Sequence, residues 1–203
     1  MAPAGLSHRR ASVALAWGRL QLKRDPLDSA PAPLTAPDLD PYHVKIAAEA
    51  FAAGLLAQTG CDVLVQYGAD QPEYDLVASK RRRSIRISVK GSQDGAWGFV
   101  QSYKSGASYH EAIERWAADH GSGLVYCFVQ FDGVKVGECP RVYLATVREI
   151  ARHLKAARGG RGTTVMHEQH TYTRGVGVGR TDAVPNKWRF TAARLNELLT
   201  RAV

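Results

Sequence analysis

The chain has 203 residues, of which 45% are hydrophobic and 23% charged, and its 27 lysines and arginines outnumber 19 acids for a formal net charge of +8. This length suffices for one domain with a sizeable buried core, and no apolar run approaches the length of a membrane-spanning helix. A basic surplus of this size favours a polyanionic partner, of which nucleic acid is the commonest, and it gives no support to a membrane location.

The N-terminal segment differs in composition from the rest. Residues 1–37 are rich in Ala and Pro with basic clusters, so we expect a flexible basic arm. The apolar stretch after Arg9 and Arg10 is short and interrupted by Arg19, so an export signal is not expected. The three cysteines show no metal-ligand spacing, which favours a reduced, cytoplasmic protein without disulfides.

The first predicted helix follows this segment. Asp40 and Pro41 are typical of a helix start, and Gly60 ends a run with apolar residues at helical spacing, namely Val44, Ala48, Phe51 and Leu55. Glu49 lies on the flank of that apolar stripe. A glutamate in this place is either a solvated charge paired with Lys45 one turn earlier or a member of a site.

A β-hairpin is predicted further along the chain, after a strand-like segment at residues 61–68. Apolar and polar residues alternate over residues 84–90, and residues 73–77 form the partner strand across the polar turn of residues 80–83. If that turn spans four residues, Ser79 faces Ser84 and Asp75 faces Ser88. A turn one residue shorter or longer would place Asp75 on the other face.

In this register Asp75, Ser88 and Lys90 share one face of the hairpin. A carboxylate beside a strand-end lysine suits metal-assisted cleavage of a phosphodiester bond. The carboxylate holds Mg²⁺, and the lysine steadies an attacking water or the developing negative charge.

The remaining elements predict an α/β domain. A capping box at residues 108–111 opens a second helix, and the apolar run at residues 124–129 is a central strand covered on both faces, which gives the order αβββαβ. A strand at 141–145 and a helix at 146–157 follow. We therefore expect a core over residues 38–158, with a basic, glycine-rich, hairpin-like segment and a C-terminal helix over residues 159–203 packed on the same domain.

This chain resembles the PD-(D/E)XK nuclease superfamily, in the form of Holliday-junction resolvases and restriction-type endonucleases. Glu49 matches the helix acid, Asp75 the metal-binding aspartate, Lys90 the lysine and Gln101 the late glutamine. The resemblance implies a restriction-endonuclease-like αβββαβ core, whose central mixed sheet is flanked by helices, with a C-terminal extension. It also implies Mg²⁺ or Mn²⁺ as cofactor, DNA as partner, and a homodimer that cuts two strands.

The resemblance also implies a role for each matched residue. Asp75 would hold the metal, Glu49 would hold it directly or through water, Lys90 would orient the nucleophile, and Gln101 would position the lysine or the phosphate. Ser88 departs from the pattern, because it stands where the family has Asp or Glu.

Three outcomes follow from the serine. The site works with fewer carboxylates, using Asp75, Glu49, the Val89 carbonyl and waters; Glu73 substitutes as a ligand from a place opposite Lys90; or the domain binds nucleic acid without cutting it.

Two functions from different classes therefore remain. The first is a divalent-metal-dependent endonuclease that hydrolyses DNA, with structured or branched DNA as its substrate. The alternative is a catalytically inactive domain of the same fold that binds nucleic acid or a protein partner. For either function, the residues expected to contact phosphates lie in basic turns and loops: Lys80, Arg81, Arg82, Arg83 and Lys104.

Overall fold

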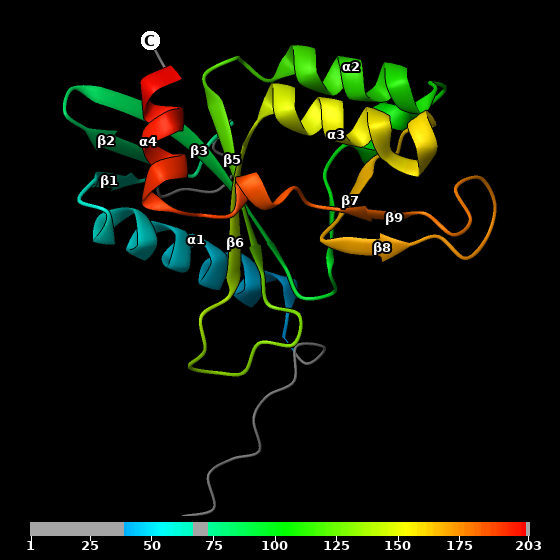
Figure 1. The fold of residues 1–203 in the computed structure, drawn as a ribbon. Helices are drawn as coiled ribbons and strands as arrows, with labels where there is room; N and C mark the ends of the chain where they lie inside the picture. The colour runs from blue at the N-terminus through cyan, green and yellow to red at the C-terminus, as the bar shows by residue number, and fades with distance from the viewer. Residues whose placement is uncertain (1–38, 67–72, 202–203) are drawn as a thin grey trace, which may run out of the picture. The chain divides into compact units, whose positions relative to one another are not determined.

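The computed structural model describes residues 39–66 and 73–201, and Figure 1 shows their fold. The arm expected at residues 1–37 lies outside the described residues. The described part is a mixed α/β domain whose central sheet is flanked by helices, as the sequence predicts.

The central sheet has five strands in the order β1-β2-β3-β5-β6. The strands are β1 (Asp62–Val65), β2 (Leu76–Lys80), β3 (Arg83–Ser92), β5 (Leu124–Gln130) and β6 (Arg141–Thr146). Strands β3 and β5 run parallel, and every other neighbouring pair is antiparallel. All seven residues of β5 are buried, because helices cover both faces of the sheet at its centre.

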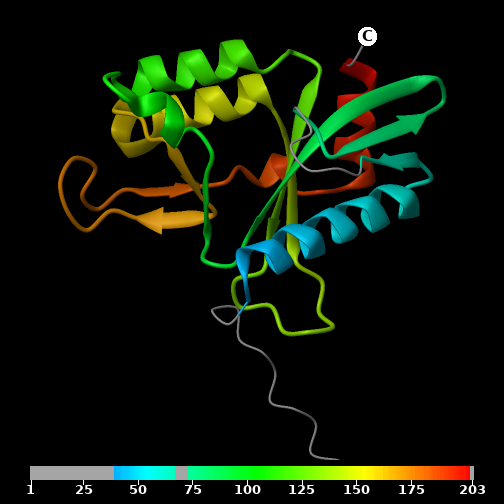
Figure 2. The same ribbon diagram turned by 180° about the vertical axis from the view of Figure 1, so that it is seen from behind.

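The helices lie on both faces of the sheet (Figures 1 and 2). One face is covered by α1 (Pro41–Gln58) and α4 (Ala192–Arg201), whose apolar side chains share a core with the sheet. The other face is covered by α2 (Tyr109–Asp119) and α3 (Val147–Gly160), which pack on each other and on a second, aromatic-rich core. Two capping boxes begin α2 and α3, as the sequence predicts.

Short elements complete the domain. They are β4 (Ala96–Gly98), η2 (Gln101–Lys104), β7 (Val165–His167), β8 (Gln169–Thr171), β9 (Thr181–Ala183) and η3 (Asn186–Trp188). Strand β4 pairs with β7, and β8 pairs with β9 as a hairpin, so the segment after α3 contains the hairpin-like structure expected of it. No helix in the described ranges is long and apolar enough to cross a membrane.

Helix α1 approaches the sheet closely at a glycine. A Cβ atom on Gly91 of β3 would lie 2.9 Å from both the Ala48 Cβ and the Val44 carbonyl oxygen, so only glycine allows this approach. The buried line of α1 is Val44, Ala48, Ala52 and Leu56. The expected stripe was therefore wrong in its second half, where Phe51 and Leu55 lie beside that line. The helix is apolar around most of its circumference, so sequence periodicity defines its buried side poorly.

The predicted register of the β2–β3 hairpin is confirmed. Ser79 pairs with Ser84, and Lys80 and Arg83 pair across a two-residue turn made by Arg81 and Arg82. The partner strand is shorter than expected, because β2 begins at Leu76 and not at residue 73. Continuing the register by one residue places Asp75 opposite Ser88, as the sequence predicts.

Candidate functional site

A pocket of about 450 Å³ lies at the end of the β2–β3 hairpin that is remote from the turn. Asp75, Ser88 and Lys90 all line it, so the structure brings together the three residues that the register places on one face. The complete lining is Pro41, Lys45, Glu73, Tyr74, Asp75, Ser88, Val89, Lys90, Gly91, His120 and Tyr126.

Asp75 is held from three directions. Its N–H donates to the Ile87 carbonyl at 2.9 Å, and its own carbonyl accepts from the Gln66 N–H at 2.9 Å. Its carboxylate oxygen Oδ2 accepts from the Val89 N–H at 2.6 Å. The backbone of the neighbouring strands therefore fixes the carboxylate, while Oδ1 has no hydrogen bond among the described residues.

Lys90 is placed by the strand and not by an ion pair. Its carbonyl accepts from the Trp97 indole N–H at 3.0 Å, which ties the end of β3 to the core. Its half-buried ammonium makes no hydrogen bond or ion pair within the described part of the chain. A lysine in this state is available to a ligand, because a partly buried charge without a partner gains from an anion nearby.

Glu49 contributes from α1. Its side chain is 24% exposed and lies 3.8 Å from the Lys45 ammonium. Burial raises the pKa of Glu49, and the negative charge of Asp75 raises it further, while Lys45 and Lys90 act in the opposite direction. Asp75 and Lys90 are therefore close enough to act on the pKa of Glu49, but Glu49 does not line the pocket with them.

Glu73 lies differently from the place that the sequence predicts. It stands outside the strand at φ 73°, so it does not face Lys90 in a ladder. Its carboxylate pairs with the Arg86 guanidinium at 3.3 Å, with both side chains 44% exposed. Glu73 still lines the pocket, but it enters the site as half of an ion pair.

His120 and Tyr126 are among the pocket residues that the sequence does not predict. His120 follows α2, and its Nδ1 donates to the Trp116 carbonyl at 2.7 Å, because a carbonyl can only accept. Tyr126 pairs with Ser88 across the parallel β3–β5 ladder, and burial raises the pKa of its hydroxyl. The sequence carries no signal for either, since Tyr126 reaches the pocket through the parallel β3–β5 pairing and His120 reaches it from the end of α2.

Other predicted site residues lie elsewhere. Gln101 is exposed in η2, with its amide against Gly98, and it does not line the pocket. Lys104 donates to the Ala107 carbonyl and stacks over the Tyr109 ring at 4.9 Å. The four basic residues from Lys80 to Arg83 occupy the far end of the hairpin, where Lys80 is five residues or roughly 17 Å from Asp75 at ~3.4 Å per residue.

The carboxylates in and near the pocket suit Mg²⁺ better than a cation that needs many protein ligands. In the described ranges, no three His, Cys, Asp or Glu side chains converge on one point, so a cage made wholly of protein side chains is not present there. Mg²⁺ usually keeps several waters and binds through one or two carboxylates together with substrate phosphates. Asp75, whose Oδ1 has no bonded partner in that part of the chain, could supply one such carboxylate, and Glu49, which does not line the pocket, is the candidate for the second.

Comparison with known proteins gives no family. No family model, curated protein or solved structure matches this chain.

Proposed function

We propose that this chain is a divalent-metal-dependent endonuclease that hydrolyses DNA phosphodiester bonds, with structured or branched DNA as its substrate. The observation that carries the proposal is the meeting of Asp75, Ser88 and Lys90 in one pocket. The charges of Asp75 and Lys90 also act on the pKa of Glu49 on α1, in opposite directions. Keeping acids next to a partly buried lysine that has no ion-pair partner among the described residues costs folding free energy unless a ligand binds to these groups.

The proposed fold is that of the PD-(D/E)XK superfamily. Three features support it: the order of helix, three strands, helix and strand; the register that places Asp75 opposite Ser88; and an acid on the first helix, Glu49, whose pKa is raised in part by Asp75. Strand β4 and η2 are additions between the third strand and the second helix.

Each residue has a distinct task in the proposed reaction. Asp75 and Glu49 would hold Mg²⁺ or Mn²⁺, with the Val89 carbonyl as a further oxygen ligand. The cation would neutralise charge on the phosphate and lower the pKa of an attacking water. Lys90 would orient that water by donating to it and would stabilise the negative charge that develops on phosphorus-bound oxygens. Lys45, on the rim of the same pocket, would attract the phosphate.

Cleavage assays test the proposal. Duplex, single-stranded and four-way-junction DNA are each incubated with the full chain and Mg²⁺ or Mn²⁺, and Lys90→Met is compared with Lys135→Met. Lys135 is an exposed lysine whose side chain makes no ion pair in the described ranges. We expect Lys90→Met to lower cleavage by roughly 10²-fold or more, a typical worth of a positioned catalytic group, and Lys135→Met to leave it unchanged. Absence of cleavage of all three substrates would refute the proposal.

A second function has one specific observation in its favour. Ser88 is 4% exposed and lines the pocket where the resembled family has a carboxylate, so the site has one acid fewer. A non-cutting domain would bind DNA equally well with Mg²⁺ or EDTA, and its affinity would survive Lys90→Met. Calorimetric titration with Mn²⁺ separates the two functions, because only the nuclease requires saturable metal binding that Asp75→Asn removes.

A further inference from the structure

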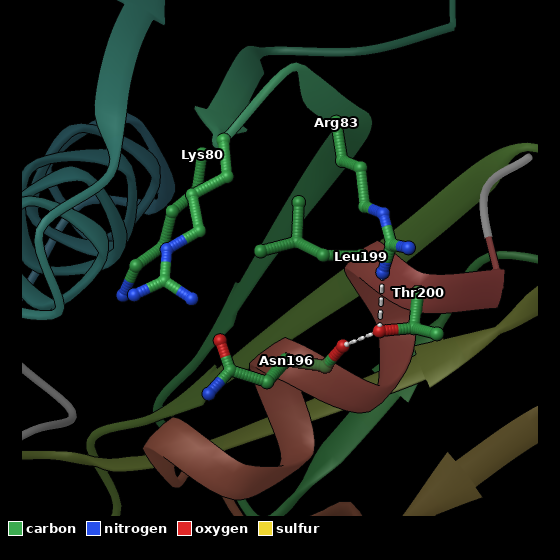
Figure 3. Close-up of a pocket in the computed structure, with 6 residues that line it drawn as sticks. Lys80, Arg83, Asn196, Leu199 and Thr200 are labelled. Atoms are coloured by element: carbon green, nitrogen blue, oxygen red, sulfur yellow. Dashed lines mark hydrogen bonds between the residues drawn. The ribbon is translucent and has the colours of Figure 1, made fainter.

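A second pocket of about 450 Å³ lies between the tip of the β2–β3 hairpin and α4 (Figure 3). We call it the tip groove, and its lining residues are Lys80, Arg81, Arg83, Asn196, Leu199 and Thr200. Three cations and two neutral polar residues line it with no carboxylate among them. It therefore differs from the pocket at Asp75, which contains acids.

Among the described residues, the cations of the tip groove have no acidic partners. Arg83 donates to the Thr200 hydroxyl at 2.8 Å, and that hydroxyl donates to the Asn196 carbonyl at 2.8 Å. Figure 3 shows Arg83 reaching from the hairpin to Thr200 of α4, with Leu199 between Lys80 and Arg83. Arg83 keeps further N–H donors, and in the described residues neither the Arg81 guanidinium nor the Asn196 side-chain amide has a hydrogen-bond partner.

Lys80, like Arg83, makes a structural contact. Its ammonium donates to the Thr59 carbonyl at the end of α1, where a positive charge stabilises the helix terminus. No comparable contact involves Arg81 within residues 39–66 and 73–201, so a role in folding accounts for only part of the charge at the tip.

The turn itself is built from unfavourable residues. Arg81 and Arg82 have φ 49° and 63°, the left-handed region that a two-residue hairpin turn of this type requires at both central positions. Asn-Gly would adopt this turn without strain, whereas side chains such as arginine adopt it at a cost. Strained residues that persist against such a cost cluster at functional sites.

We propose that the tip groove binds phosphate groups of a nucleic-acid backbone. Arginine forks match phosphate geometry, and the Asn196 amide adds a neutral donor on the opposite wall. Lys80 follows Ala78 in the alternation of β2, on the face that packs with α1 and α4, whereas Asp75 and Ser88 lie on the opposite face of the hairpin. The tip groove is thus separate from the proposed reaction site, and its ligand contact does not depend on cleavage.

The test uses a variant that should improve folding while removing binding. Arg81→Asn with Arg82→Gly replaces the strained turn by a relaxed one, so the thermal midpoint should rise by roughly 3–6 °C. Fluorescence anisotropy in EDTA measures the affinity of the full chain for a labelled 12-nucleotide DNA. We expect about tenfold weaker binding and a salt slope smaller by about one to two, since each lost phosphate contact lowers that slope by roughly one.

Two controls isolate the groove from net charge. Arg115→Gln with Arg174→Gln removes two exposed positive charges elsewhere and should change affinity by less than about twofold. Asn196→Ala leaves the charge unchanged and should weaken binding about threefold, since the amide lies on the α4 side of the groove. Equal losses in both double variants, or no loss with Asn196→Ala, would overturn the proposal.

The source of the phosphate is resolved by competition. Inorganic phosphate should displace the oligonucleotide only at concentrations far above those at which unlabelled DNA of the same length does so. Two results together would show that the groove is a site for a free anion and that the backbone assignment is wrong. Millimolar phosphate would displace the DNA completely from the parent, and it would no longer displace DNA from the turn variant. All of these measurements are made in EDTA, so they stand or fall independently of the cleavage assays.

Discussion

The two ends of the β2–β3 hairpin carry opposite chemistry. At one end, Asp75, Ser88 and Lys90 line a pocket that contains both acids and bases. At the other end, three cationic residues line the tip groove, and no acidic residue lines it. One antiparallel register determines the residues at both ends, because it fixes which residues of β2 and β3 lie opposite each other along the whole hairpin.

The difference lies in what holds each end. Backbone hydrogen bonds fix Asp75, so the end of the hairpin that carries Asp75, Ser88 and Lys90, which we call the acid end, is preorganised by the sheet itself. The tip is held by side-chain contacts to Thr59 and Thr200 and by a turn in strained conformation. We infer that substitutions at the acid end should change chemistry with little effect on folding, whereas substitutions at the tip should change binding and stability in opposite directions.

The sharpest way to break this comparison is Asp75→Asn. Asparagine still accepts the Val89 N–H but loses the negative charge, so folding should persist while metal binding fails. Loss of groups that merely orient metal ligands costs roughly 10–100-fold, so loss of a ligand should reduce cleavage at least about 100-fold. Binding of the 12-nucleotide DNA in EDTA should stay within about twofold of the parent, because the tip groove is untouched.

Asp132→Asn is the matched control. Asp132 is exposed, and its only hydrogen bond in the described part is from its backbone N–H to the Gln130 side chain, which the substitution preserves. Cleavage by Asp132→Asn should equal that of the parent. If both variants lose cleavage activity equally, the loss in Asp75→Asn does not come from a metal ligand at position 75.

Ser88→Glu sharpens the comparison from the other direction. Ser88 lines the pocket opposite Asp75, so a glutamate there would add a hard oxygen ligand near the same cation. Affinity for Mn²⁺ should rise by roughly tenfold, since affinity follows the charge count of the ligands. Calorimetry measures this rise, and cleavage should increase with it if ligand shortage limits the parent. Unchanged metal affinity in Ser88→Glu would contradict the shared-face geometry on which the metal site rests.

The hairpin could be predicted from sequence, but its surroundings could not. Alternation over residues 84–90 and a four-residue polar connection determine the register, so the meeting of Asp75, Ser88 and Lys90 followed from local pattern. Tyr126 and Asn196 come from β5 and α4, and long-range packing that no local pattern encodes brings them to their pockets. Glu73 was misplaced for a local reason, since the strand ends before it and its backbone turns to positive φ.

Substitutions at Gly91 of β3 and Gly54 of α1 test the close packing of α1, the helix that carries Glu49, against the sheet. Gly91→Ala would place a methyl group 2.9 Å from α1 backbone and should cost about 1–3 kcal/mol of stability. It should also lower cleavage, because α1 must move away from β3.

Gly54→Ala is the control within α1 itself, with nothing within 4 Å of the new methyl group. That change should stabilise by about 0.5–1 kcal/mol, the difference between glycine and alanine in a helix. Urea denaturation measures both changes, and equal effects would mean that the close approach at Gly91 is unimportant.

Glu49→Gln should have the smallest effect, and its sign depends on pH. Because the pKa of Glu49 is raised by burial and by Asp75, the folded protein binds this proton more tightly than the unfolded chain does. The resulting stability is fully present below the ordinary pKa of 4.5 and is lost as pH rises through the raised value. Glutamine mimics the neutral acid at every pH, so in EDTA the variant should match the parent below pH 4.5 and be more stable at pH 7.

The matched variant Glu114→Gln has the opposite expectation. Its hydrogen bond to Lys155 lowers the pKa of Glu114, so this substitution should be slightly destabilising at pH 7 and neutral in acid. Addition of Mg²⁺ should then stabilise the parent but not Glu49→Gln at pH 7, because a bound cation requires the ionised carboxylate. Urea midpoints at pH 4 and pH 7, with and without Mg²⁺, measure all of these differences. Stabilisation of Glu49→Gln by Mg²⁺ equal to that of the parent would remove Glu49 from the proposed metal site and leave Asp75 as its one carboxylate from the described elements.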